Sequence, residues 1–201
     1  MRLFLASMGI GGIPGFLGDP AGLRLVYVPT AAKPMKDGAF AERSRAALAA
    51  MGFDLDDLEV DEVEQGRMKS ALDSADAVFV EGGSPFWLLQ AMRETGFDRI
   101  VVDAVRGGLP YIGISAGALV AGPNVEPLSA VSNTSLAPRL RSTEALGLAD
   151  YVVYPHYDSP ERAEGFPKLL AEYGERFRLL PLTDSQALVI DNGTAKMVES
   201  G

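Results

Sequence analysis

Ser115 is the residue of this 201-residue chain best placed to act as a nucleophile. It sits in Gly113-Ile114-Ser115-Ala116-Gly117, a G-x-S-x-G pattern that follows an apolar run and precedes a stretch of small residues. This context is typical of a strand–turn–helix elbow, which holds a serine hydroxyl exposed on a strained turn. The N–H of Ala116 would then lie at a helix N-terminus, directed at an oxyanion beside Ser115. A chain with 22 glycines can form the pattern by chance, but the flanking strand and helix favour the elbow.

His156 is the only imidazole in the chain that could take a proton from Ser115. A serine hydroxyl is a weak nucleophile unless a base removes its proton. His156 follows the predicted strand Asp150–Tyr154 directly, in Pro155-His156-Tyr157. A lone histidine is more often structural, but we interpret this one as the general base if Ser115 is the nucleophile.

Gly82-Gly83 lies at the end of another predicted strand, Ala77–Val80. A backbone without side chains can approach a substrate carbonyl and supply a second oxyanion N–H. The same two glycines could equally form a simple turn from the strand into the helix at Phe86–Glu94. Both interpretations stay open from the residues alone.

The elements around these residues predict one α/β domain spanning residues 1–201. Continuous apolar runs such as Leu23–Pro29 are typical of strands buried on both faces of a parallel sheet. Segments with helical spacing, such as Ala39–Met51 and Phe97–Arg106, alternate with these runs. We therefore expect a three-layer sandwich with a mostly parallel central sheet, and an active site at the carboxyl ends of its strands.

The remaining segments are less regular. Gly9–Gly15 is rich in glycine but lacks the G-x-G-x-x-G spacing, so we expect a substrate-facing loop and not a nucleotide site. Gly122–Pro138 has no periodicity, and we expect an irregular or hairpin segment there.

Three closing strands are predicted at Arg178–Leu182, Ala187–Asp191 and Ala195–Val198, the last two joined by an Asn192-Gly193 turn.

Composition excludes several classes of function. The chain has no cysteine, which rules out a thiol nucleophile, a disulfide framework and a cysteine zinc site. A net charge of −9 without a Lys/Arg cluster argues against a nucleic-acid partner. The N-terminus is not typical of a signal peptide, and no apolar stretch is long enough for a membrane helix. We expect a cytoplasmic protein with a small-molecule substrate, no cofactor or metal, and at most a second copy of itself as partner.

These motifs together resemble those of the peptidase E (aspartyl dipeptidase) family. The resemblance rests on Glu81-Gly82-Gly83-Ser84 with Phe86-Trp87-Leu88-Leu89, on the serine elbow and on Pro155-His156-Tyr157. That family comprises serine peptidases with a fold like that of class I glutamine amidotransferases (flavodoxin-like), and cyanophycinase is a relative. The resemblance implies hydrolysis of dipeptides with N-terminal aspartate. By position it makes Ser115 the nucleophile and His156 the base, with the N–H groups of Gly83 and Ala116 as the oxyanion hole.

The acid that orients His156 departs from the family pattern. Family members with an aspartate carry it about fifteen residues beyond the serine, where this chain has Ala130. We predict that Glu126, slightly earlier in the same segment, takes this role, which would resemble a related branch of the family with a glutamate as the acid. Asp158 ranks second, because a residue so close to His156 rarely reaches the far ring nitrogen, and Asp184 ranks third.

Substrate contacts are predicted mainly from the resemblance. An aspartate side chain requires a cation, and Arg139, Arg141 and Arg162 flank His156, with Arg162 roughly matching a family arginine. Asp184 and Asp158 are also expected in the pocket. Ser84, which stands where better-known members have asparagine, is expected there too, together with Arg162.

Two other functions remain open from the sequence. One is an esterase or acylase that uses the elbow in an ordinary α/β-hydrolase. The other is a catalytically silent binding protein on an amidotransferase-like fold. A glutamine amidotransferase itself is disfavoured, because its thiol nucleophile is missing.

Overall fold

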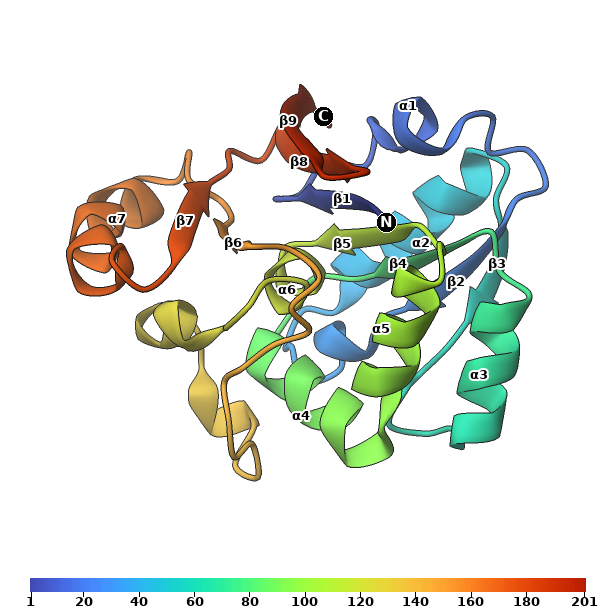
Figure 1. Ribbon diagram of the computed structural model, residues 1–201, viewed down its shortest axis with the longest axis horizontal. Coiled ribbons are helices and arrows are strands. Elements are labelled where there is room, and N and C mark those ends of the chain that lie inside the picture. The colour runs from blue at the N-terminus through green and yellow to red at the C-terminus, as the bar shows by residue number, and fades with distance from the viewer.

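The computed structural model describes residues 1–201, and its centre is a seven-stranded sheet with the strand order β3-β2-β4-β5-β1-β8-β9 (Figure 1). The first five strands in this order are parallel, whereas β8 and β9 form an antiparallel hairpin that pairs with β1. The main-sheet strands are β1 (Arg2–Ala6), β2 (Arg24–Val28), β3 (Asp54–Asp57), β4 (Ala77–Val80), β5 (Tyr111–Ile114), β8 (Gln186–Asp191) and β9 (Thr194–Glu199).

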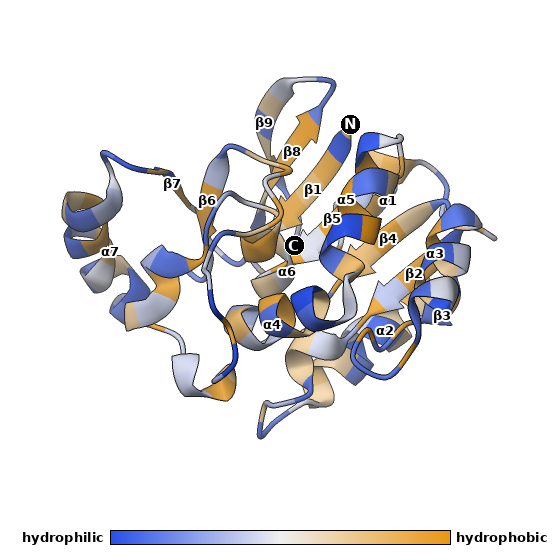
Figure 2. Ribbon diagram, turned by 60° about the horizontal axis from the view of Figure 1, so that its bottom comes forward, coloured by the Kyte–Doolittle hydropathy of each residue, from blue (hydrophilic) through white to orange (hydrophobic).

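Helices cover both faces of this sheet, which gives the three-layer α/β sandwich expected from the sequence. The helices are α1 (Ile13–Leu17), α2 (Ala39–Ala50), α3 (Gln65–Asp73), α4 (Pro85–Thr95), α5 (Phe97–Arg106), α6 (Ala116–Val120) and α7 (Pro160–Tyr173). Apolar side chains of α1 and α2 pack on one face, and those of α3, α4, α5 and α6 pack on the other. Figure 2 shows the apolar strands inside and mixed or polar outer surfaces on the helices.

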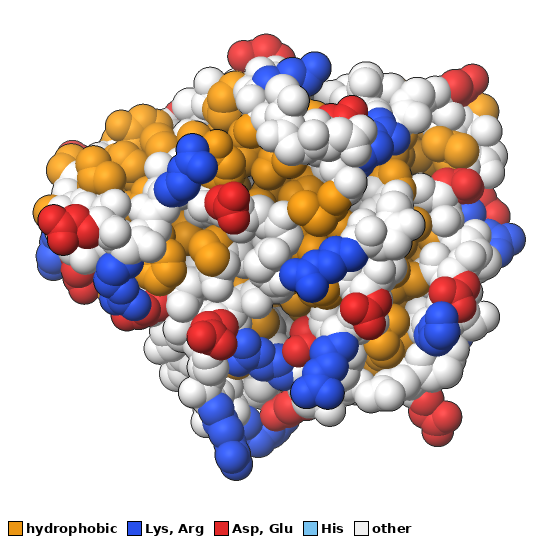
Figure 3. Space-filling view, in the orientation of Figure 1, with side chains coloured by type: hydrophobic (Ala, Val, Ile, Leu, Met, Phe, Trp, Pro, Cys, Tyr) orange, Lys and Arg blue, Asp and Glu red, His pale blue; other side chains and the backbone are white.

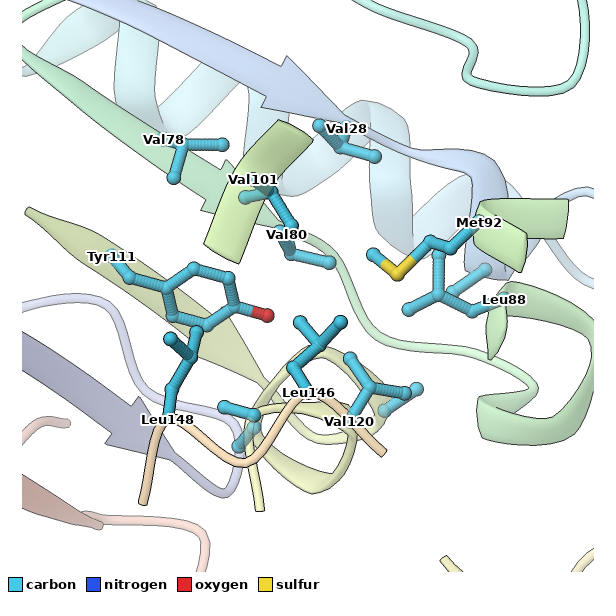
Figure 4. Close-up of a cluster of buried hydrophobic side chains, with 14 of the residues drawn as sticks. Val28, Val78, Val80, Leu88, Met92, Val101, Tyr111, Val120, Leu146 and Leu148 are labelled. Atoms are coloured by element: carbon cyan, nitrogen blue, oxygen red, sulfur yellow. The ribbon is translucent and has the colours of Figure 1, made fainter. Parts of the chain in front are cut away.

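The core strands send alternate side chains to the two faces. In β4, Val78 and Val80 join the larger cluster, and Phe79 joins the smaller one. Both faces of the strand are buried, which is why the sequence here is continuously apolar. Figure 4 shows Val78 and Val80 beside Tyr111, and the Tyr111 hydroxyl donates to the carbonyl of Gly117 at 2.7 Å. This bond ties β5 to α6 on either side of the elbow.

A separate two-stranded parallel sheet lies beside the sandwich. It consists of β6 (Tyr151–Tyr154) and β7 (Arg178–Pro181), connected by α7. Figure 1 shows this unit at one side of the molecule, beyond the end of the sheet that carries β8. The prediction of three closing strands was right about their existence, but β7 does not join the hairpin β8–β9 in one sheet.

Two segments differ from the predicted loops. Ile13–Leu17 forms the short helix α1, with Pro14 in its first turn, where a missing N–H costs nothing. The irregular segment after the elbow contains two short 3₁₀ helices, Glu126–Ala130 and Thr134–Leu136.

None of the helices is both long and apolar enough to cross a lipid bilayer. Positive and negative side chains are interspersed on the face in Figure 3.

Candidate active site

The serine elbow predicted at Ser115 forms at the carboxyl end of β5. Ser115 adopts φ 47° and ψ −103°, a region that non-glycine residues rarely occupy. Its N–H donates to the carbonyl of Ala6 at 2.9 Å, and its carbonyl accepts from Leu119, so both sides of the turn are fixed. The strain therefore persists because the surrounding backbone determines it, and the hydroxyl is held partly exposed.

The glycines of the elbow are required by close backbone contacts. A Cβ on Gly117 would lie 2.0 Å from the carbonyl oxygen of Val80, and one on Gly113 would lie 2.5 Å from that of Gly117. Such distances are far below any van der Waals contact. The elbow thus packs directly on the end of β4, which brings Ser115 next to Gly82.

His156 meets Ser115 as the sequence predicted. The Ser115 Oγ lies 3.2 Å from the His156 Nε2. His156 follows β6 by two residues and has φ 62°, a left-handed conformation that is uncommon for non-glycine residues. Its N–H donates to the Ser7 Oγ at 2.7 Å, and its carbonyl accepts from Ser159 at 3.0 Å, which fixes the unusual backbone.

Asp184 is the acid that contacts the other ring nitrogen. Its Oδ1 lies 2.6 Å from the His156 Nδ1 and also accepts a hydrogen bond from the Ser7 Oγ at 2.8 Å. Because a carboxylate only accepts, Nδ1 carries the proton, and Nε2 is free to accept from Ser115. The three side chains therefore form a continuous hydrogen-bonded chain from Ser115 to Asp184.

The prediction that Glu126 orients His156 is wrong in this structure. Glu126 begins a 3₁₀ helix, and its carboxylate forms an ion pair with Arg176, with an Oε2–Nη2 distance of 2.7 Å. The third-ranked candidate, Asp184, occupies the position instead. Asp158, ranked second, accepts from the N–H of Asp184 at 3.2 Å, so it supports the acid and does not touch the imidazole.

Strand pairing explains why Asp184 lies here. β8 runs antiparallel to β1, so the residues that precede β8 lie at the edge where β1 ends. Ser7 follows β1 at that edge, and its N–H donates to the carbonyl of Gln186 at 3.1 Å. Ser7 is fully buried, and the sequence analysis did not single it out because no local motif marks it. The Asn192-Gly193 turn predicts that β8 is antiparallel to β9, but no local signal predicts the pairing of β8 with β1.

A cavity of about 390 Å³ opens beside the hydrogen-bonded side chains of Ser115 and His156. It is lined by Ser115 and His156, together with Ser7, Glu81, Gly83 and Arg162. A larger cavity of about 670 Å³ lies at the amino ends of β4 and β5, near Asp76 and Pro110, and no serine or histidine lines it. The smaller cavity is therefore the candidate active site.

The two predicted oxyanion donors border the same site. Gly83 has φ 137°, and a Cβ there would lie 2.1 Å from the carbonyl oxygen of Ala31, so only glycine fits. Neither the Gly83 N–H nor the Ala116 N–H donates a hydrogen bond within the protein. In contrast, the Gly82 N–H is already used, because it donates to the Glu81 carboxyl at 2.7 Å.

Arg162 is the one arginine of the three candidates that reaches the cavity. Its guanidinium lies over the Tyr154 ring at 5.5 Å, and Nη2 is 3.5 Å from the carbonyl oxygen of Val131. Its Nη1 is buried without any hydrogen-bond partner. Arg139 is paired with Glu94 on the surface, and Arg141 is exposed outside the cavity.

Ser84 is not a cavity residue, contrary to expectation. It caps α4, and its hydroxyl accepts from the N–H of Trp87 at 3.3 Å. Asp158 is likewise absent from the cavity wall. Of the predicted substrate contacts, Arg162 lines the cavity, and Asp184 lies behind His156.

The family match places this fold and site in the class of serine-type hydrolases. Residues 11–198 match the sequence profile of peptidase family S51, so the chain belongs to that family and is a serine peptidase. This membership favours a peptidase over the α/β-hydrolase esterase and the catalytically silent binding protein considered from the sequence.

Relatives of known sequence and structure agree with this assignment. An uncharacterized peptidase of Listeria monocytogenes (Lmo0363) is 29% identical over 192 residues, covering 94% of each chain. Peptidase E of Streptomyces coelicolor is 41% identical over 149 residues, which cover 74% of this chain and 56% of that protein. The crystal structure of a candidate peptidase E protein from Listeria monocytogenes superposes with a TM-score of 0.92 at 26% identity, covering 100% of this chain and 98% of that one.

Proposed function

We propose that this serine peptidase is a dipeptidase that hydrolyses short peptides with N-terminal aspartate through Ser115, His156 and Asp184. The observation that carries the proposal is the continuous hydrogen-bonded chain through these three side chains, which ends at the strained elbow. This arrangement gives each side chain one role in acyl transfer.

In the acylation step, the Ser115 Oγ attacks the carbonyl carbon of the scissile bond while its proton moves to the His156 Nε2. The carbonyl oxygen becomes an oxyanion, which accepts from the free N–H groups of Gly83 and Ala116. His156 then gives the proton to the departing amine as the C–N bond breaks, leaving an acyl ester on Ser115. Water, activated by His156, hydrolyses this ester and regenerates the serine.

Asp184 keeps His156 in the tautomer that these reaction steps need. With the proton held at Nδ1, Nε2 can accept from Ser115, and the carboxylate stabilises the imidazolium formed during attack. Ser7 donates to the same oxygen of Asp184 and accepts from the His156 backbone, so it fixes the two groups relative to each other.

Arg162 supports the preference for aspartate. A buried guanidinium nitrogen without a partner is costly, and a substrate carboxylate would satisfy it with a charge-assisted bond. The cavity volume of about 390 Å³ is at the lower end of small-ligand pockets, which fits a dipeptide better than an extended chain.

The test compares Asp-, Ala- and Leu-p-nitroanilide as substrates for the wild type and Arg162→Met. We expect the wild type to prefer the aspartyl substrate, and the variant to lose about 10-fold to 100-fold of that preference with less effect on the other two. Arg43→Met is the matched control, because Arg43 is exposed on α2 and forms no ion pair. Equal cleavage of all three substrates by the wild type refutes the aspartate preference.

A further inference from the structure

Glu81 is a buried carboxyl group beside the candidate oxyanion site, and the mechanism above does not use it. It follows β4 directly, is 1% exposed, and borders the same cavity as Ser115 and His156. No lysine, arginine or histidine lies within ion-pair distance of it. A buried carboxylate without a cation is strongly disfavoured, so the surroundings favour the neutral acid.

The hydrogen bonds around Tyr27 give independent evidence about the proton. The Tyr27 hydroxyl lies 2.7 Å from the carbonyl oxygen of Ala41 and 2.8 Å from the Glu81 Oε2. A tyrosine carries one hydroxyl proton, and the Ala41 carbonyl can only accept. If Glu81 were ionised, two acceptors would face a single proton. If Glu81 is protonated, it donates to Tyr27, Tyr27 donates to Ala41, and both contacts are satisfied.

The titratable groups around Glu81 are consistent with a protonated Glu81 carboxyl group. Burial raises the pKa of Glu81, and the contacts with Gly82, Tyr27 and Ser44 only partly oppose that effect. Burial also raises the pKa of Tyr27, so the phenol stays protonated. On α2, Arg45 is already bidentate with Asp57, and Arg43 is exposed. Across the cavity, the lining contains His156 and Arg162.

We propose that Glu81 acts in its neutral form as a positioning residue for the oxyanion side of the active site. The proposal rests on the function proposed above. The Glu81 Oε1 accepts from the Gly82 N–H at 2.7 Å, so the carboxyl group fixes the peptide that leads to Gly83. Through Tyr27 it also ties this turn to the carbonyl of Ala41 on α2. The neutral form keeps negative charge away from the substrate oxygen, whose own charge develops during attack.

Ionisation of Glu81 would disturb the site in two ways. The new charge would lie on the residue next to Gly82, which packs against Ser115. A Cβ added to Gly82 would lie 3.4 Å from the Ser115 Cβ. It would repel the developing oxyanion in a region sheltered from water. It would also leave Tyr27 with one proton for two acceptors. Both effects predict a lower rate when the proton is lost.

Infrared difference spectroscopy tests the protonation state without relying on activity. At pH 7, the wild type should show the carbonyl stretch of a protonated carboxyl group, and Glu81→Gln should lack it. Glu94→Gln is the matched control, because Glu94 pairs with Arg139, which lowers its pKa, and its replacement should leave the band in place. Tyr27→Phe removes the acceptor of the Glu81 proton, so the band should move to higher frequency. If the wild type and Glu81→Gln do not differ in this region, the proposal is overturned.

The pH dependence of kcat/KM then tests the positioning role. As the pH rises, kcat/KM of the wild type should fall about 10-fold or more over the range in which the carboxyl band disappears. Glu81→Gln should not show this fall, because its amide accepts from Gly82 and donates to Tyr27 at every pH. A band that disappears without any fall in kcat/KM refutes the positioning role. A band that is present in a protein without peptidase activity leaves Glu81 protonated and refutes the proposed function instead.

Discussion

Replacing Asp184 with asparagine is the most informative test of how the site works. The substitution keeps the size of the side chain but removes its charge. In the wild type, the Asp184 Oδ1 lies 2.6 Å from the His156 Nδ1 and 2.8 Å from the Ser7 Oγ. An amide does not stabilise the imidazolium that forms when Ser115 attacks, and it can donate to Nδ1 and favour the wrong tautomer.

The expected loss can be bounded from burial. In a fully enclosed serine–histidine–aspartate triad, this change lowers kcat by about 10⁴-fold. Here the side chains of His156 and Asp184 are 32% and 38% exposed, so water can partly replace the lost charge. We therefore expect kcat to fall by about 10²-fold to 10⁴-fold, which corresponds to about 2.7 to 5.4 kcal/mol of transition-state stabilisation.

The assay measures kcat and KM separately for Asp184→Asn and for Glu126→Gln. KM should change little in Asp184→Asn, because Asp184 does not line the cavity. Glu126→Gln breaks only an exposed ion pair with Arg176 and should stay within about twofold of the wild type. The reasoning fails if Glu126→Gln is the inactive variant, or if Asp184→Asn turns over at the wild-type rate.

Three further predictions follow from the same contacts. Ser7→Ala should lower kcat about 10-fold and destabilise the fold by about 1–3 kcal/mol in denaturant titrations, since it leaves the buried His156 N–H without its acceptor; an unchanged kcat would show that Ser7 is not needed for positioning. Gly117→Ala should lower Tm strongly, because its Cβ would lie 2.0 Å from the Val80 carbonyl, whereas Gly15→Ala, with open space around it, should not; similar Tm values would contradict the packing argument. The pKa of Glu81 is raised in the folded protein, so its contribution to stability is complete below the ordinary glutamate pKa and is lost as the pH rises through the folded-state pKa. The Tm of the wild type should therefore fall relative to that of Glu81→Gln with increasing pH. A constant difference between the two Tm values would contradict this.

The parallel core and the elbow could be predicted from the sequence because their signals are local. A strand buried on both faces must be continuously apolar, and β2, β4 and β5 were recognised on that basis. The elbow requires glycine where backbones touch, so its pattern is visible in five residues. The rule that active sites lie at the carboxyl ends of parallel strands then placed Ser115 near Gly82 and Gly83.

The acid could not be predicted with the same ease, because its position depends on a long-range strand pairing. Asp184 precedes β8, and it reaches His156 only because β8 runs antiparallel beside β1. The family-based prediction of Glu126 failed because that residue turns toward Arg176 in its own short helix. Ser7 was missed for a similar reason, since a single serine after a strand has no distinguishing neighbours in the sequence.

The family resemblance favoured Arg162 among the three arginines, but the residue types alone gave no reason for that choice. Arg139 and Arg162 have the same chemistry, and both lie in segments that flank His156 in the sequence. Only the structure shows that Arg139 is paired with Glu94, while Arg162 keeps a buried nitrogen without a partner at the cavity. Side-chain pairing of this kind is decided by packing between distant elements and leaves no periodic signal.

Covalent labelling with a fluorophosphonate probe tests the central claim, that His156 activates Ser115 as the nucleophile, most directly. We expect one equivalent of probe on the wild type, located on Ser115 by peptide mass spectrometry. Ser115→Ala should remain unlabelled although its Tm equals that of the wild type. His156→Ala should react with the probe more slowly by orders of magnitude. Labelling of a different serine, or equally fast labelling in His156→Ala, would contradict the account.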